Sequence, residues 1–440
     1  MHIIQQVLFI LLFIIAVYLF TRKVRQIRRN IFLGKSKTID DHKRERWRNV
    51  LLLAFGQKKM FRNWIPAILH FFVYAGFIII NIEITEIILD GLTGKHRMFS
   101  PLLGPVYNVL IGCFEILALL VIFGCAMFLI RRNVLKIKRF WQREMTHWPK
   151  SDANYILIME IILMLLFLTM NTTDSALQLR HAAHYTQTGP FWCSALMAPL
   201  FDHTSTGTLI GLERGAWWLH ITGILFFLNY LPYSKHFHII LAFPNAYYAD
   251  LEPEGKMANM PEIEHEVKLM FEPPPPSENA PAGAPSPERF GAKEVTDLTW
   301  KNLMDAYSCT ECGRCTAACP ANQTGKLLSP RKIMMDTRDR LEEVGRKLNK
   351  DGKFEGDGKT LLYDYITPEE LWACTTCNAC VKECPVSIKP LDIILQLRRS
   401  LVMDDAKAPA EWNAMFSNIE NNRAPWKFSP EDREKWREDL

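Results

Sequence analysis

Long apolar runs dominate the first 250 residues, whereas charge and proline dominate the rest of the chain. Five runs are close to the ~20 residues that span a bilayer; they lie at about 3–20, 64–89, 102–130, 155–173 and 216–241. A buried core helix could explain any single run. Five such runs, each flanked by charge, Trp or Tyr, instead predict a bundle of five transmembrane helices over residues 1–250. The first run lacks a preceding basic segment and a small-residue cleavage site, so we interpret it as a retained anchor.

Lys and Arg are distributed unevenly among the segments that connect these runs. The segments after the first and third runs are rich in both, whereas the loops near 91–101 and 175–215 contain only Lys95, Arg97, Arg180 and Arg214. Cytoplasmic loops carry the excess of Lys and Arg. The pattern therefore predicts an outward amino terminus and a cytoplasmic carboxy-terminal half. We expect a multi-pass protein of a bacterial or archaeal cytoplasmic (inner) membrane.

The polar half of the chain divides into three parts. Residues 251–293 are predicted to be a linker, because their proline runs at 273–276 and 280–287 cannot bury a core. Residues 294–405 are predicted to form a helical domain, followed by a polar tail at 406–440. Within the domain, Ser329-Pro330 predicts the start of a helix over 331–347. Thr367 and Glu370 form a capping box that predicts a second helix start. The fold class is therefore mainly α.

Eight of the eleven cysteines fall in two runs of identical spacing, C-x2-C-x2-C-x3-C, each followed by proline. This spacing is typical of a two-cluster [4Fe–4S] ferredoxin, in which the fourth Cys of each run binds the other cluster. The ligands predicted for the first cluster are Cys309, Cys312, Cys315 and Cys384. The ligands predicted for the second cluster are Cys374, Cys377, Cys380 and Cys319. Zinc sites, which usually pair two short C-x2-C units, and disulfides, which need an oxidising compartment, fit this pattern poorly.

Four of the twelve histidines lie inside the predicted spans, where an ionisable side chain is costly and usually functional. A haem b requires two His from different helices at matching depth. His70 lies six residues after Trp64, ~9 Å along a helix, and His238 lies close to the same end of the antiparallel fifth run. These two can meet, with His236 as the alternative to His238, because residues two apart point in nearly opposite directions on a helix. The alternative interpretation is that these histidines are hydrogen-bonded packing residues or interface anchors.

A second haem would need different ligands. His220 is eighteen residues from His238, ~27 Å along a helix, so it cannot share a haem with His70. His184, or His181 beside it, lies just beyond the fourth run and is a candidate partner. These residues could equally line a quinone pocket or lie in water. Arg180, His184 and Glu86 are candidate quinone contacts near the outer face.

Two known families share these features. The five runs, the His of the second and fifth runs, and the separation of His220 and His238 resemble the nitrate reductase gamma and heterodisulfide reductase cytochrome b subunits. The segment from Pro232 to His238 is similar to the fifth-span motif of the iron–sulfur oxidoreductase branch. The cysteine domain resembles the helical ferredoxin module of the heterodisulfide reductase C subunit and of succinate dehydrogenase-type iron–sulfur proteins. The gamma subunit has two His thirteen residues apart in its second span, but here Glu83 follows His70 at that distance.

The resemblance implies a membrane-bound electron-transfer subunit of a hetero-oligomeric respiratory oxidoreductase. Its electrons would pass between the quinone pool, haem b, two [4Fe–4S] clusters and a soluble partner. That partner would be a Cys-Cys-Gly iron–sulfur protein, an electron-transfer flavoprotein or a flavin dehydrogenase. The chain has no Cys-Cys pair, so we expect the terminal chemistry on another subunit.

Other functional classes are less well supported by the sequence. The net charge is only +5, and no basic stripe interleaved with aromatics indicates nucleic-acid binding. A haem-free membrane-anchored ferredoxin is one alternative. A redox sensor is another, although no recognisable output domain is present.

Overall fold

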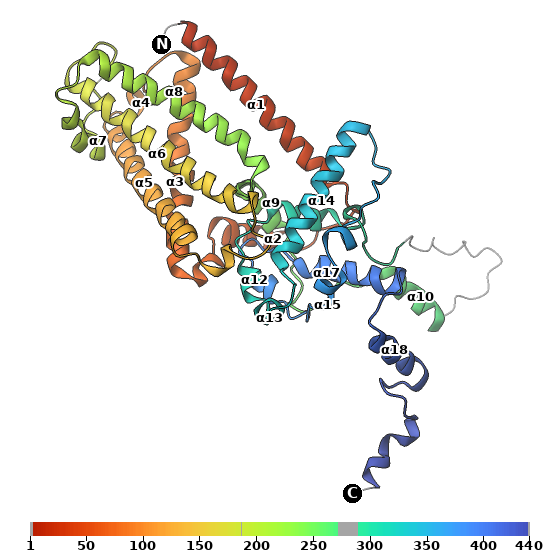
Figure 1. The fold of residues 1–440 in the computed structure, drawn as a ribbon. Coiled ribbons are helices and arrows are strands. Elements are labelled where there is room, and N and C mark those ends of the chain that lie inside the picture. Colours follow the sequence, from red (N-terminus) through yellow and green to blue (C-terminus); the bar gives the residue numbers. More distant parts are fainter. Residues whose placement is uncertain (1–2, 186, 272–288, 439–440) are drawn as a thin grey trace.

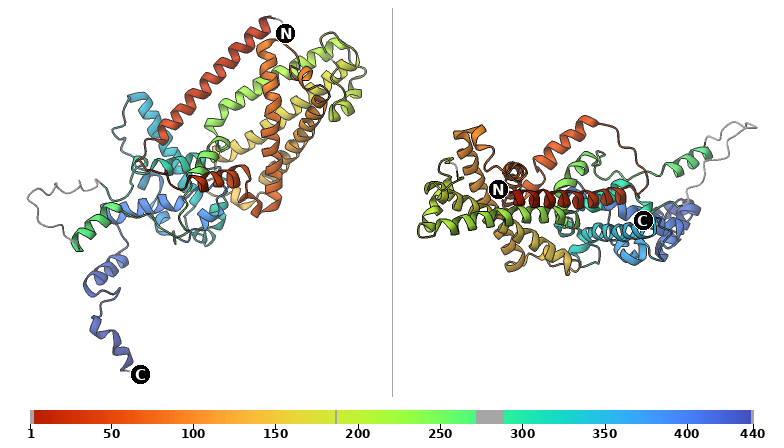
Figure 2. Two further views of the ribbon diagram at one scale, coloured as in Figure 1. Left: turned by 180° about the vertical axis from the view of Figure 1, so that it is seen from behind. Right: turned by 90° about the horizontal axis from the view of Figure 1, so that it is seen from above.

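The structure is a computed structural model that describes residues 3–185, 187–271 and 289–438. All the regular structure in these ranges is helical. An amino-terminal bundle of long helices packs end-on against a compact carboxy-terminal domain, and a tail containing α18 projects from that domain (Figures 1 and 2). The mainly-α fold class is therefore confirmed.

Four helices of the bundle are long and apolar enough to cross a membrane. They are α1 (Ile3–Ile31), α3 (Trp64–Thr93), α5 (Pro105–Leu129) with its continuation η3 (Ile130–Val134), and α6 (Trp148–Leu179). The described part of the bundle also contains α2 (Lys43–Asn49), η1 (Val50–Phe55), η2 (Met60–Arg62), α4 (Ser100–Leu103), η4 (Lys138–Phe140), α7 (Trp192–Met197) and η5 (Ala198–Phe201).

The fifth predicted span, 216–241, is not a single helix. The chain instead forms α8 (Thr206–Tyr230), two short turns η6 (Leu231–Tyr233) and η7 (Lys235–Phe237), and α9 (His238–Tyr247). Pro232 explains the break, because proline has no N–H to donate and its ring clashes with the preceding turn. Glu213, Arg214 and His220 also interrupt the apolar sequence of α8, which nevertheless packs against α6 and α1. The count of five spans is thus not confirmed.

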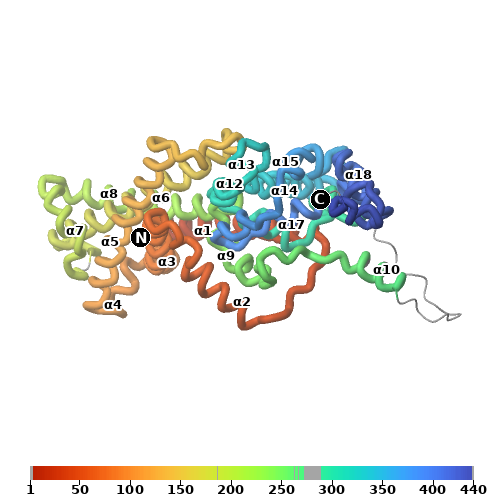
Figure 3. Tube along the Cα trace, turned by 90° about the horizontal axis from the view of Figure 1, so that it is seen from below, coloured from red at the N-terminus to blue at the C-terminus, as the bar shows by residue number. Residues whose placement is uncertain are grey.

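The two basic connecting segments lie at the end of the bundle that faces the carboxy-terminal domain. Arg46 donates hydrogen bonds to the carbonyls of Tyr247 and Ala249, and the Arg139 carbonyl accepts one from Arg331 of the domain. The loops that contain α4 and α7 lie at the opposite end (Figure 3). The orientation of the bundle in a membrane stays a prediction.

The carboxy-terminal domain is built around α14, and both predicted helix starts in it are confirmed. Ser329 caps α14 by accepting a hydrogen bond from the Lys332 N–H, and Thr367 and Glu370 form a capping box at α15. The helices of this part are α10 (Pro261–Phe271), α11 (Trp300–Ser308), α12 (Arg314–Ala318), α13 (Pro320–Gln323), α14 (Pro330–Asp351), α15 (Pro368–Trp372), α16 (Ala379–Glu383), α17 (Pro390–Arg399) and α18 (Ala410–Asn422), with short segments η8 (Val295–Asp297), η9 (Leu361–Tyr365), η10 (Ser400–Asp404) and η11 (Pro430–Arg437).

The structure describes only part of the predicted linker. Helix α10 occupies 261–271, and the proline runs at 273–276 and 280–287 lie outside the described residues.

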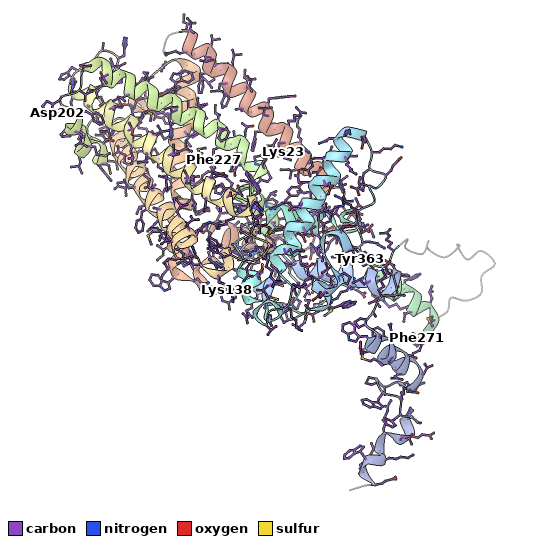
Figure 4. The ribbon with its side chains drawn as sticks, in the orientation of Figure 1. Lys23, Lys138, Asp202, Phe227, Phe271 and Tyr363 are labelled. Carbon is purple, nitrogen blue, oxygen red and sulfur yellow. The ribbon has the colours of Figure 1, made fainter. Side chains whose placement is uncertain are left out.

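A continuous core joins the bundle and the domain. At the end of α1, Lys23 forms an ion pair with Glu342 of α14 at 3.1 Å (Figure 4), and the buried Asn30 amide donates to the Tyr307 hydroxyl at 3.1 Å. Buried polar contacts of this kind fix one arrangement of the two units, because each group would lose its partner if the units separated.

Candidate iron–sulfur and haem sites

The two cysteine runs adopt the same backbone conformation. In the first loop Glu311 and Gly313 have φ of 53° and 72°, and in the second loop Thr376 and Asn378 have φ of 57° and 59°. Each loop leads into a five-residue helix, α12 or α16, and these two helices pack against each other. The fourth Cys of each run follows its helix directly, so the packing of α12 on α16 brings it to the opposite loop.

The structure brings Cys384 to the first loop. Cys309, Cys312, Cys315 and Cys384 line one small cavity of about 20 Å³. Burial and the neighbouring thiols, Cys384 among them, raise the pKa of Cys309 to about 12. The four residues predicted for the first cluster thus lie together.

Cys319 lies correspondingly at the second loop. Burial, followed by the charges of Cys374 and Cys319, raises the pKa of Cys380 to about 12. The Thr376 N–H also donates to the Cys374 sulfur at 3.4 Å, a bond of the kind that tunes a cluster's potential. The geometry supports crossed ligation, while ligation itself stays a prediction.

No three His, Cys, Asp or Glu side chains converge on a single ion position within the described ranges. A zinc ion would require such convergence, since its thiolate ligands lie only ~2.3 Å from the metal. A [4Fe–4S] cluster binds each thiolate to a different iron, so its ligands need not converge on one ion position.

The surroundings of the two loops differ. Glu311 of the first loop forms buried ion pairs with Lys235, which lies between α8 and α9, at 2.5 Å and with Arg338 of α14 at 2.7 Å. Burial favours the neutral acid, but the Arg338 and Lys235 charges outweigh it and lower the pKa of Glu311. In the second loop, Cys377 is exposed.

Three of the predicted haem residues form a group that we call the histidine cluster: His70, His236 and His238. The rings of His236 and His238 lie 5.4 Å apart. The charges of His70 and His238 both act on His236, and the charge of His238 acts on His70. The three side chains are therefore neighbours. The structure therefore brings the predicted ligands of the first haem together.

Hydrogen bonds orient two of these rings. His70 Nδ1 lies 3.0 Å from the Gln57 amide oxygen, and His238 Nδ1 lies 3.0 Å from the Lys235 carbonyl oxygen. An Nδ1–H donated to an oxygen leaves Nε2 with a free lone pair, which is the arrangement of a metal-binding histidine. Among the described residues no such bond orients the His236 ring, so the donor set fits a haem b held by His70 and His238 better than one held by His236.

The histidine cluster and the first cysteine loop are neighbours. Lys235, which pairs with Glu311, directly precedes His236, and Glu311 lies between Cys309 and Cys312. The charge of Arg314 also acts on His70. The cluster predicted at Cys309 would therefore lie next to the histidines.

The structure does not bring His220 and His184 together, which corrects the pairing predicted for a second haem. His220 is buried, and its Nδ1 bonds the Leu163 carbonyl at 2.9 Å. Leu163 lies sixteen residues before the end of α6, ~24 Å along the helix. His184, like His181, is exposed beyond that end.

Two of the three residues predicted to contact a quinone have structural partners. Arg180 donates to the carbonyls of Phe201, Asp202 and Thr204, and Glu86 accepts from the Tyr107 hydroxyl and the Phe99 N–H. These contacts hold loops at the far end of the bundle.

Sequence reasoning missed Lys235, Glu311 and Gln57, which join or orient the sites. The available signals were weak. Glu311 is a charged residue inside a cysteine loop, and Lys235 is a charged residue inside a predicted span.

Comparison with known protein families identifies the cysteine domain. A family described as "4Fe-4S dicluster domain" matches residues 308–388. Both cysteine runs fall within this match. The resemblance to the C subunit of heterodisulfide reductase is also confirmed. The chain is 34% identical over 119 residues to the C subunit of the ferredoxin/F(420)H(2)-dependent CoB-CoM heterodisulfide reductase of Methanosarcina acetivorans, covering 27% of this chain and 60% of that protein.

Longer relatives match the bundle and the cysteine domain together. The chain is 29% identical to the "Probable iron-sulfur-binding oxidoreductase FadF" of Bacillus subtilis, covering 98% of this chain and 60% of the relative. It is 26% identical to the "EtfAB:quinone oxidoreductase" of Syntrophomonas wolfei, covering 88% of this chain and 53% of the relative. The chain thus spans between half and two thirds of the length of these relatives. No solved structure matches. The matches thus support an iron–sulfur domain that follows a helical, apolar amino-terminal half.

Proposed function

We propose that this protein is a membrane-bound electron-transfer subunit of a respiratory oxidoreductase complex. It would relay electrons between a membrane quinone, a haem b held by His70 and His238, the two [4Fe–4S] clusters and a soluble partner. The haem and the clusters supply one-electron chemistry, which the protein tunes through axial ligands, hydrogen bonds and burial.

One observation carries this proposal: the ion pair between Lys235 and Glu311 places the histidine cluster beside the first cysteine loop. The Asn245 amide reinforces the contact by donating to the Val386 carbonyl, two residues after Cys384, at 2.8 Å. The residues proposed to hold the haem and those proposed to hold the first cluster thus lie on adjoining surfaces. Such an arrangement suits passage of electrons from one to the other.

The exposed second loop is the proposed contact with the partner. Cys377 is exposed, whereas Cys309 is buried, so the second cluster is the one that a soluble protein could approach. The relative named EtfAB:quinone oxidoreductase favours an electron-transfer flavoprotein. A Cys-Cys-Gly protein or a flavin dehydrogenase would use the same surface. We place the domain in the cytoplasm and the bundle in the inner membrane.

The proposal is tested on the purified full-length protein under anaerobic conditions. Optical spectra should show a b-type haem that menadiol reduces, together with iron–sulfur signals. His70→Ala should abolish the haem absorbance and retain the clusters, whereas His220→Ala, the matched control within the bundle, should retain both. Absence of b-type absorbance from the wild type would contradict the proposal and favour the haem-free membrane-anchored ferredoxin.

A further inference from the structure

A cavity lies inside the bundle between α3, α5, α6 and α8. Its volume is about 110 Å³, and its walls are apolar except for Asn81 and Glu160. Ile80 and Leu228 are among the apolar lining residues. None of the ligands predicted for the haem or the clusters lines it.

Glu160 has no structural role that explains its position. The side chain is buried on α6, and no hydrogen bond or ion pair within the described residues engages its carboxyl group. A carboxyl group at this depth of an apolar bundle is costly, and residues of this kind usually have a function. Asn81 donates its amide to the Phe77 carbonyl of the same helix, which leaves the amide oxygen available as an acceptor.

The cavity adjoins the histidine cluster and reaches the surface of the bundle. Phe227, labelled on α8 in Figure 4, lines the cavity, and its ring lies 5.6 Å from the His236 ring. Phe77 and Ile84, also in the wall, are only half-buried. A lipid-soluble molecule could therefore enter from the lipid-facing side of α3.

The volume of the cavity limits the size of the ligand that it can hold. One water needs ~10–15 Å³ of such volume, so the cavity holds roughly seven to eleven water-sized groups. A benzoquinone ring with its two oxygens has about eight non-hydrogen atoms and a naphthoquinone about twelve, whereas a haem has about forty. Apolar walls with a few polar groups are typical of small-molecule sites.

We propose that this cavity binds the head group of a membrane quinone, with Glu160 and Asn81 as the hydrogen-bond partners of its ring oxygens. The ligand class rests on the proposed function, and the location is new. An ionised Glu160 would accept a hydrogen bond from a quinol hydroxyl, and a protonated one would donate to a quinone carbonyl. The site thus lies within the bundle, not at Arg180, His184 and Glu86.

Photo-crosslinking of the full-length protein with an azido-naphthoquinone tests the site directly. Peptide mass spectrometry should find the label in residues 76–84, 160–164 or 224–231, and excess menadione should suppress it. Ile80→Trp and Leu228→Trp, which fill the cavity, should each reduce labelling by about tenfold, and Glu160→Gln by roughly fivefold. Ile82→Trp is the matched control, because Ile82 is on the same helix but is 45% exposed; it should label like the wild type.

The possible outcomes test the cavity site and the proposed function separately. Labelling that both cavity-filling variants leave unchanged, or a menadione-sensitive label elsewhere in the chain, would overturn the site and leave the proposed function intact. Loss of haem absorbance in both variants would show that the cavity holds the porphyrin, which also overturns the site. No menadione-sensitive label in the wild type would contradict the quinone relay itself.

Discussion

The two cysteine loops have one backbone conformation and two environments. Both loops use left-handed residues at matching positions and lead into five-residue helices. The first loop is buried against the membrane bundle through Lys235, whereas the second has an exposed cysteine. The spacing of the cysteines therefore specifies the conformation of each loop, while the packing of the domain on the bundle specifies which loop lies beside the histidine cluster and which has an exposed cysteine.

The largest expected effect comes from replacing the fourth cysteine of each run with serine. Because Cys319 lies beside Cys374 and Cys380, Cys319→Ser should abolish the signal of the exposed cluster. Cys384→Ser should abolish that of the buried cluster. EPR of the reduced variants measures both signals. If Cys319→Ser removed the cluster at Cys309 instead, crossed ligation would be wrong.

A smaller effect should follow when the docking contact is broken. Glu144, in the loop before α6, accepts hydrogen bonds from Arg331, which is fully buried on α14, and from Ser329. Glu144→Gln would leave the Arg331 charge without its counter-ion and should destabilise the docked domain by about 3 kcal/mol. Chemical unfolding followed by cluster absorbance measures this change. Glu355→Gln, at the exposed Lys353–Glu355 pair, is the control and should leave the midpoint unchanged.

The matched loop positions Gly313 and Asn378 should respond differently to substitution. A Cβ at Gly313 would lie 2.5 Å from Arg331 Nη1, and φ there is +72°. Gly313→Ala should therefore cost ~1–2 kcal/mol for the left-handed backbone alone, plus the displacement of Arg331. Asn378→Gly, at the equivalent position of the exposed loop, should change stability little, because glycine adopts this conformation readily. A Gly313→Ala protein that unfolds at the same midpoint as Asn378→Gly would contradict the strain and the Arg331 contact assigned to Gly313.

The smallest effect is the pH dependence of the Glu144 contact. Burial favours the neutral acid, but the Arg331 charge and the Ser329 hydrogen bond outweigh it and lower the pKa of Glu144 below its usual 4.5. A lowered pKa in the folded state means that the stabilisation is complete above about pH 4.5 and is lost as the pH falls further. The difference in unfolding free energy between the wild type and Glu144→Gln should shrink over that lower range. A difference that is independent of pH would contradict this assignment.

Local signals in the sequence predicted much of the iron–sulfur domain. The spacing of the cysteines predicted which residues come together, and the side chains of Ser329 and Thr367 predicted the starts of α14 and α15, because capping depends on residues within one turn. The prediction of the fifth span as a single helix was wrong, because Pro232 interrupts the helix between α8 and α9.

Contacts between distant segments could not be predicted from the sequence. The pairs Lys235–Glu311 and Glu144–Arg331 join residues 76 and 187 positions apart, and no local pattern specifies such partners. The pairing for a second haem was wrong for a similar reason. His220 lies on α8 and His184 lies beyond the end of α6, and their relative depth depends on how these two helices pack. The cavity at Glu160 needs walls from four helices, although a carboxyl residue inside a predicted span was a signal that could have been followed.

Magnetic coupling between the haem and the clusters tests the proposed order of the sites most directly. EPR relaxation of the reduced clusters should be compared in the wild type, with the haem oxidised, and in His70→Ala. We predict that the signal lost in Cys384→Ser relaxes faster when the oxidised haem is present, and that the signal lost in Cys319→Ser changes much less. Faster relaxation of the Cys319-dependent signal alone, or no change in either, would contradict an order in which the buried cluster lies between the haem and the exposed cluster.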